Sequence, residues 1–130
     1  MNQLDENFPQ DQQPLLQQWR IPYRRIGLEV AQAGIKDGHI IPLLHRLRHV
    51  TFFTQDEDFY ERNLCHQAYC LVWLDVKADD AAAYVRRFLR HPAFDTKAKR
   101  MAVVARAYSK GVQYWHARKR GMTSVRWDGD

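Results

Sequence analysis

The feature that most constrains the fold is a near-continuous apolar run at residues 69–76, Tyr-Cys-Leu-Val-Trp-Leu-Asp-Val. A strand with one face in water alternates apolar and polar residues, whereas this run is apolar on both faces of an extended backbone. We therefore predict a strand inside a sheet that is covered on both sides. Asp79 and Asp80 follow, where the dipole of a helix N-terminus favours acids. An amphipathic helical stripe comes next, made of Ala81, Tyr84, Val85, Phe88 and Leu89.

The other predicted elements also alternate between strands and helices. Strands are predicted at residues 1–4, 23–26, 51–54, 101–108 and 112–115, with one more short strand at 123–127. A helix is expected after Asp11, which would cap it, with Pro14 in its first turn. Its inner face consists of Leu15, Leu16 and Trp19.

After a loop at residues 28–36, Asp37 opens a second helix, either as its N-cap or as a metal ligand. The apolar stripe of this helix consists of Ile40, Leu43, Leu44 and Leu47. A short helical turn is expected at residues 59–63, and Ser-Lys-Gly at residues 109–111 signals a C-terminal hairpin. Strands alternating with helices favour an α/β class with a mostly parallel sheet. We expect the 130 residues to form a single domain, residues 1–130.

The strand that starts at Thr51 runs into Thr-Gln-Asp-Glu-Asp-Phe at residues 54–59. If the extended backbone continues that far, Asp56 and Asp58 point to the same side. Adjacent like charges repel each other, and a divalent cation would offset the repulsion. Carboxylate oxygens suit Mg²⁺ or Mn²⁺, and such sites lie where parallel strands end. The alternative interpretation is an Asp-rich turn after an edge strand.

Charge is distributed unevenly along the chain. Residues 1–80 carry 8 Lys and Arg against 12 Asp and Glu, whereas residues 81–130 carry 12 against 3. A cation-rich half suits a polyanion such as RNA, and an acid-rich half suits a metal site. The alternative is that the charges only solvate the surface. The candidate residues for binding the RNA backbone are Lys97, Lys99, Arg100, Arg118, Lys119 and Arg120.

Several classes of protein are disfavoured. The histidines show no H-x-E or H-E-x-x-H spacing, which argues against a zinc hydrolase. The chain contains no Gly-rich phosphate loop and no G-x-S-x-G nucleophile motif. No apolar run approaches the roughly 18 residues of a membrane span, and the polar N-terminus is unlike a signal peptide. We therefore expect a cytoplasmic protein with no membrane partner.

Three stretches taken together resemble a known family. They are Asp-Glu-Asn-Phe-Pro at residues 5–9, Asp37 at the opening of a helix, and the stretch at residues 54–59. In this combination they look like PIN-like nucleases, and more closely like the small bacterial toxin-type branch related to the Mut7-C domain. The resemblance covers about residues 3–76 and the helix that follows.

The resemblance implies an α/β/α sandwich in which acidic residues meet at the carboxyl ends of parallel strands. There they would bind one or two Mg²⁺ or Mn²⁺ ions and hydrolyse RNA phosphodiester bonds. The matching residues of this chain are Asp5, Asp37, Asp56 and Asp58, with Glu6 and Asn7 at the margin of the site. The family commonly has an acid at the position of His39, and this difference bears on a second metal ion.

The predicted function is a metal-dependent ribonuclease, the toxin of a toxin–antitoxin pair. Its expected partners are RNA and a small antitoxin protein, and a homodimer is compatible with this function. The alternative is a catalytically weak module of the same fold that binds nucleic acid or a partner through the basic C-terminal half. Metal-dependent turnover would distinguish the two, because a binding module needs no aspartates.

Overall fold

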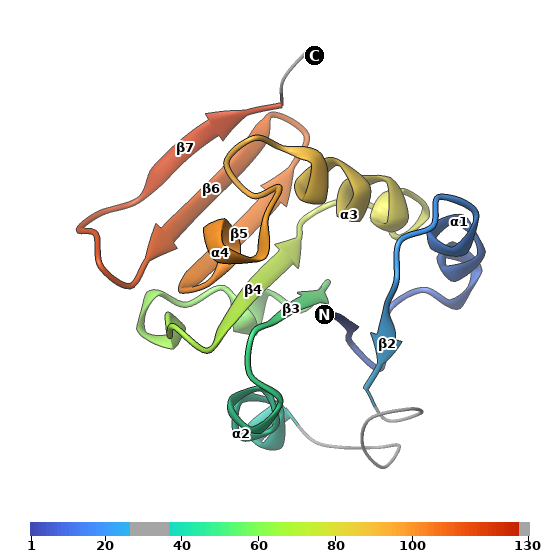
Figure 1. Cartoon of the computed structure of the whole chain (residues 1–130). Coiled ribbons are helices and arrows are strands. Elements are labelled where there is room, and N and C mark those ends of the chain that lie inside the picture. The colour runs from blue at the N-terminus through green and yellow to red at the C-terminus, as the bar shows by residue number, and fades with distance from the viewer. Residues whose placement is uncertain (27–36, 128–130) are drawn as a thin grey trace.

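The apolar run forms strand β4 (Tyr69–Leu74), in the middle of the sheet. The computed structural model describes residues 1–26 and 37–127, the side chain of Asp37 excepted. Within these residues a seven-stranded sheet has the order β2-β1-β3-β4-β5-β6-β7 (Figure 1). The remaining strands are β1 (Asn2–Leu4), β2 (Arg24–Arg25), β3 (Val50–Thr54), β5 (Val103–Tyr108), β6 (Gly111–His116) and β7 (Thr123–Arg126).

Strands β1 to β5 are parallel, whereas β6 and β7 are each antiparallel to the preceding strand. The α-helices are α1 (Gln13–Gln18), α2 (Asp37–Leu47), α3 (Ala81–Arg90) and α4 (Lys97–Arg100). Four short 3-10 helices join them: η1 (Gln10–Gln12), η2 (Glu57–Phe59), η3 (Arg62–Leu64) and η4 (Ala78–Asp80). The predicted α/β class with a mostly parallel sheet is confirmed.

Alternation along the strands divides the hydrophobic core between the two faces of the sheet. On one face Leu4 and Phe53 pack in a core with Leu16 of α1 and Phe88 of α3. On the other face Phe52 packs in a second core, which is shared with α2. The second core includes Ile40, Leu43, Leu44, Leu71 and Val104. Each fully buried side chain of this size contributes about 1.5–3 kcal/mol, so both layers are needed to hold the sheet.

The two crossover connections on the first face have opposite hands. The chain steps from β1 to β2 in one direction across the sheet and from β4 to β5 in the other. Helices α1 and α3, which make these steps, both pack in the core of Leu4 and Phe53. Since nearly all such connections in proteins are right-handed, one of the two belongs to the rare left-handed class. In consequence, α3 lies on the face of Leu4 and Phe53, and it does not cover the other face of β4 and β5.

The C-terminal strands extend the sheet by an antiparallel meander. Strands β5 and β6 are joined by a tight turn in which Tyr108 pairs with Gly111, and β7 then pairs with β6. Strands β5 and β6 form a hairpin at the Ser-Lys-Gly stretch where the sequence predicts one, and β7 lies where a further short strand is predicted at residues 123–127. Gly111 has a φ of +149°, and an added Cβ would overlap the carbonyl oxygen of Val125. Only glycine fits here, because the backbone of β7 passes so close.

Some predicted details differ from the structure. Asp11 does not cap α1, since it lies inside η1 and the residue before α1 is Gln12. The buried Gln12 instead accepts a hydrogen bond from the backbone N–H of Ala82 at 3.1 Å, which joins α1 to the start of α3. The turn expected at residues 59–63 is replaced by η2 and η3. The loop expected at residues 28–36 lies outside the described residues.

Candidate functional site

Asp5 is held at the carboxyl end of β1 by contacts with β3. Its backbone N–H donates to the carbonyl oxygen of Phe53 at 3.0 Å, which continues the pairing of the two strands by one residue. Its Oδ2 accepts a hydrogen bond of 2.6 Å from the hydroxyl of Thr54. Asp5 is half-buried and Thr54 is fully buried, so the orientation of this carboxylate is restricted.

Asp56 lies at the carboxyl end of β3 and contacts the same hydroxyl. Its backbone N–H donates to Thr54 Oγ1 at 2.9 Å. Its Oδ1 accepts a hydrogen bond of 2.9 Å from the backbone N–H of Asp58, which makes Asp56 the N-cap of η2. The hydroxyl of Thr54 therefore donates to one acidic residue and accepts from the other, and both residues are at the same edge of the sheet.

This edge is the point at which the chain changes direction across the sheet. After Asp5 the chain turns to the first core, where Phe8 is buried. After Asp56 it turns to the second core, where Phe59 is buried. Two neighbouring parallel strands whose connections leave toward opposite faces enclose a crevice at their carboxyl ends, the usual ligand position in doubly wound α/β folds. Asp5 and Asp56 are on either side of that position.

The other predicted acids are arranged differently. Strand β3 ends at Thr54 and Asp58 lies in η2, so the two aspartates of this segment do not share an extended backbone. The side chain of Asp58 is exposed. Glu6 follows Asp5 directly, and its carbonyl oxygen accepts hydrogen bonds from Arg25. Asp37 begins α2, but its side chain lies outside the described part of the chain. Nowhere in the described residues do three His, Cys, Asp or Glu side chains come close enough to hold a metal ion.

Two residues at this edge were not singled out from the sequence. Thr54 joins the acids through its hydroxyl. In the sequence it opens the stretch at residues 54–59 that carries part of the resemblance, but no role was predicted for it. Asp75 directly follows β4, and its Oδ2 accepts hydrogen bonds from Arg106 at 2.8 and 2.7 Å. Asp75 could have been found from the sequence, because it is an acidic residue directly after a buried strand. This acid is neutralised by Arg106, whereas no ion pair to Asp5 or Asp56 is formed within residues 1–26 and 37–127.

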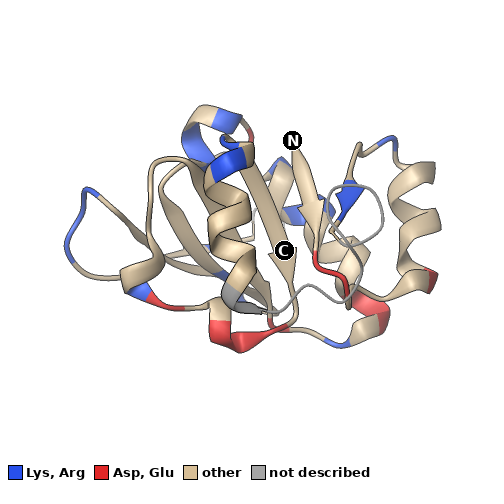
Figure 2. Ribbon diagram, turned by 90° about the horizontal axis from the view of Figure 1, so that it is seen from below, with Lys and Arg blue, Asp and Glu red and all other residues tan. Residues whose placement is uncertain are grey.

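The predicted RNA-binding cations lie at the opposite edge of the sheet. Helix α4, with Lys97, Lys99 and Arg100, ends just before β5 begins. Residues 118–120 follow β6, whose last residue pairs with the first residue of β5. Both groups are therefore at the amino edge, about 17–20 Å from the acidic edge by the length of a strand. Figure 2 shows most acidic segments along one side of the molecule and these basic segments away from them.

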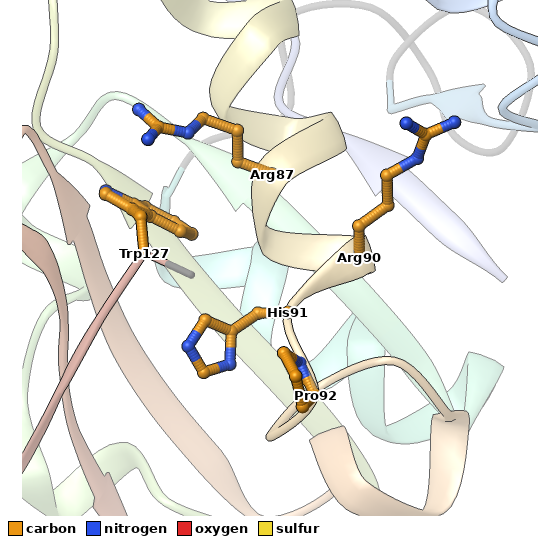
Figure 3. A pocket seen from close by; sticks show the side chains of 5 residues that line it. All are labelled: Arg87, Arg90, His91, Pro92 and Trp127. Carbon is orange, nitrogen blue, oxygen red and sulfur yellow. The ribbon is translucent and has the colours of Figure 1, made fainter. Parts of the chain in front are cut away.

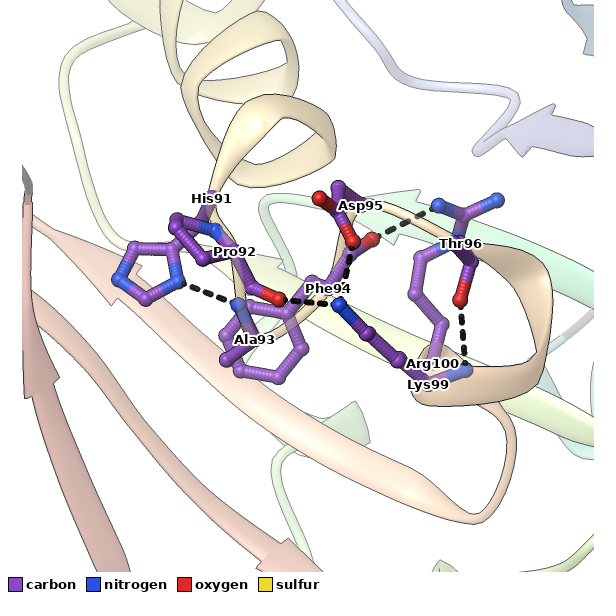
Figure 4. Close-up of polar contacts among 8 residues, drawn as sticks. All are labelled: His91, Pro92, Ala93, Phe94, Asp95, Thr96, Lys99 and Arg100. Carbon is purple, nitrogen blue, oxygen red and sulfur yellow. Dashed lines mark hydrogen bonds and ion pairs between the residues drawn. The ribbon is translucent and has the colours of Figure 1, made fainter.

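Two of these cations also have structural contacts (Figure 4). Lys99 Nζ lies 2.9 Å from Asp95 Oδ1 and 2.8 Å from the carbonyl oxygen of Pro92. Arg100 donates to the carbonyl oxygen of Phe94 at 2.8 Å and to the hydroxyl of Thr51 at 3.0 Å. Burial lowers the pKa of the Arg100 guanidinium. These contacts fasten the segment between α3 and β5 to β3.

A cavity of about 300 Å³ lies between the end of α3 and the end of β7. It is lined by Arg87, Arg90, His91, Pro92 and Trp127 (Figure 3). Arg87 extends over the Trp127 ring with its Cζ atom 4.8 Å from the ring centroid, and His91 Nε2 is 2.7 Å from the carbonyl oxygen of Arg126. Neither Asp5 nor Asp56 is among the described residues that line this cavity, so it is distinct from their site.

Comparisons with known proteins add no assignment: no family model, curated protein or solved structure matches the chain significantly. Among the described residues, no helix is both long enough and apolar enough to span a membrane.

Proposed function

We propose that this protein is a metal-dependent ribonuclease of PIN-like fold, with its active site at the carboxyl ends of β1 and β3. The observation that supports this most is the pair Asp5 and Asp56, joined through the hydroxyl of Thr54 at the point where the chain changes direction. The resemblance described above would add Asp37 and Asp58 as further ligands, with Glu6 at the margin.

The residues present fit Mg²⁺ or Mn²⁺. Mg²⁺ is usually bound by one or two carboxylates and completes its shell with waters and substrate phosphates. Two half-buried carboxylates at a crevice meet this requirement without a dedicated cage of protein ligands. When bound, the ion would activate a water molecule and stabilise the leaving oxygen of the phosphodiester.

The chain itself contributes orientation. Thr54 donates to Asp5 and the N–H of Asp58 donates to Asp56, so one oxygen of each carboxylate is fixed before substrate arrives. Carboxylates that are already oriented need no rearrangement when the charge of the transition state develops, which is the main source of electrostatic catalysis. The resemblance further supports a cytoplasmic toxin that is paired with a small antitoxin protein.

One observation favours the alternative of a catalytically weak binding module. Among the described residues, no third acidic side chain joins the pair of Asp5 and Asp56. An exchange of Asp56 for asparagine tests both functions, because asparagine keeps the shape and removes the charge. A nuclease should lose cleavage of single-stranded RNA in Asp56→Asn and in chelator, whereas a binding module should bind RNA equally well in both.

The matched control is Asp79→Asn, which removes an exposed acid near the same edge but outside the pair. Cleavage in Mg²⁺ or Mn²⁺ should be unchanged in Asp79→Asn and abolished in Asp56→Asn. Undiminished cleavage by a highly purified Asp56→Asn preparation would refute the proposed function.

A further inference from the structure

A continuous row of side chains crosses one face of the sheet and begins at the candidate active site. Thr54 of β3 pairs in register with Trp73, Trp73 with Arg106, Arg106 with Gln113, and Gln113 with Ser124. Residues paired in register point to the same face of a sheet. The row therefore spans four steps between strands, about 19 Å. Its first member is the residue that contacts both acids.

This row is the first one beyond the helix-covered part of its face. The preceding row consists of Phe52, Leu71 and Val104, which belong to the core shared with α2. Helix α3 packs on the other face, so no α-helix of the described chain covers the row over β4 to β7. Tyr60 lies over part of it, with its ring centroid 5.4 Å from that of Trp73. Trp73 is half-buried and belongs to neither core.

The centre of the row is held rigidly. Arg106 donates to Asp75 through two nitrogens and to Gln113 Oε1 at 2.9 Å. Its guanidinium carbon lies 4.2 Å from the ring centroid of Tyr108 and 5.6 Å from that of Trp73. Planar groups are thus fixed side by side on a part of the sheet that Tyr60 covers only partly and no described α-helix covers, and no ordering of long side chains is needed when a flat ligand binds.

We infer that this face binds single-stranded RNA by stacking of bases on Trp73 and its neighbours, and so leads the strand to Asp5 and Asp56. The inference rests on the proposed function, since it names how the substrate of that site is held. Bases stack on aromatic rings and on arginine planes irrespective of sequence. Exposed Lys110 and Arg126 lie at the carboxyl side of the row and supply charges that suit a phosphate backbone.

The test measures binding of a fluorescein-labelled oligouridylate by fluorescence anisotropy in chelator, where cleavage is absent. Trp73→Leu should weaken binding roughly five- to 150-fold, which corresponds to the loss of one stacked base. The matched control is Trp19→Leu, because Trp19 is also half-buried beneath an arginine, with the Cζ of Arg86 4.7 Å from its ring centroid. Binding by this control should equal that of the parent.

Two charge variants at exposed positions keep the test independent of folding. Ser124→Glu places a negative charge at the far end of the row, and Ala98→Glu places one on α4 at the amino edge. We expect weaker binding in Ser124→Glu and unchanged binding in Ala98→Glu. The reverse result would show that RNA lies at the amino edge and would overturn the inference.

The outcomes separate this inference from the proposed function. Tight binding in chelator that depends on Trp73, without any cleavage in Mn²⁺, would support the RNA-binding face and refute the nuclease. Metal-dependent cleavage with the same KM in the parent and in folded Trp73→Leu would refute the binding face and leave the nuclease. Failure of the parent to bind single-stranded RNA would refute the inference and leave a protein partner as the occupant of this face.

Discussion

Replacement of Thr54 by valine should destabilise the fold, because valine keeps the shape of threonine and removes its hydroxyl. The hydroxyl is fully buried, donates to Asp5 at 2.6 Å and accepts from the N–H of Asp56 at 2.9 Å. Loss of a hydrogen bond to a charged group costs about 1.5–3 kcal/mol, and a buried unpaired N–H costs about 1–3 kcal/mol. Water can reach the two half-buried aspartates and offsets part of this cost, so we expect a net loss of about 2–4 kcal/mol.

This loss is measurable as a shift of the melting temperature in chelator. An unfolding entropy of about 2.1 cal/mol/K per residue gives roughly 3–4 °C per kcal/mol for a chain of this length, so Thr54→Val should melt roughly 7–15 °C lower. Thr54→Ser keeps the hydroxyl and should lose only about 1 kcal/mol for its methyl group. If Thr54→Val melted at the temperature of the parent, the hydroxyl would not join the two acids and the argument for the site would fail.

Three further predictions concern other parts of the fold. Gly111→Ala should lower the free energy of unfolding in urea by about 1–3 kcal/mol or more, since its φ is +149° and a Cβ would overlap the backbone of β7. The control Gly121→Ala, at φ +72° with open space around it, should lose less stability. Arg100→Met should lose about 2–4 kcal/mol through its bonds to β3 and to the segment before α4, whereas exposed Lys97→Met should unfold like the parent. Burial and two neighbouring cations lower the pKa of His116, so the unfolded chain binds its proton more tightly. Stability should therefore fall as pH drops below the ordinary histidine value of 6.5, and His116→Gln should reduce this slope in melting curves measured against pH.

The elements with strong periodicity were predictable from the sequence. Strand β4 is buried on both faces and therefore apolar at nearly every position, and α3 buries Val85 and Phe88 one turn apart, which produces a pattern of period 3.6. The stripe of α2 was found for the same reason. Such patterns record which face is buried, and this information is local.

The position of charges relative to the sheet was not predictable, because it depends on topology. The sum of charges in residues 81–130 is the same wherever α4 and residues 118–120 lie. They fall at the amino edge because α4 precedes a parallel strand and because β6 runs back along it. The face of the sheet on which α3 packs could not be predicted either, because the apolar stripe of the helix has the same period on either side of the sheet.

The candidate site was predictable in part. Acids after β1 and β3 could be placed at one edge once a parallel sheet was expected, and the structure has Asp5 and Asp56 there. The role of Thr54 could not be derived, because it depends on the register of β1 against β3, which brings the two strand ends level. The capping of η2 by Asp56 depends on where β3 ends, and the alternation of residues along a strand does not fix its last residue.

Most of the acids lie at the carboxyl edge, whereas the basic segments of α4 and residues 118–120 lie at the amino edge, and this gives the molecule an electric dipole moment along its strands. At an ionic strength of about 0.01 M the screening length of roughly 30 Å exceeds the length of a strand, so a polyanion would experience both edges and would rotate the protein amino edge first. At about 0.1 M the screening length of roughly 10 Å is shorter than a strand, and the edges act separately. The orientation in which RNA first meets the protein should therefore change with salt, and with it the share of encounters that begin at the acidic crevice.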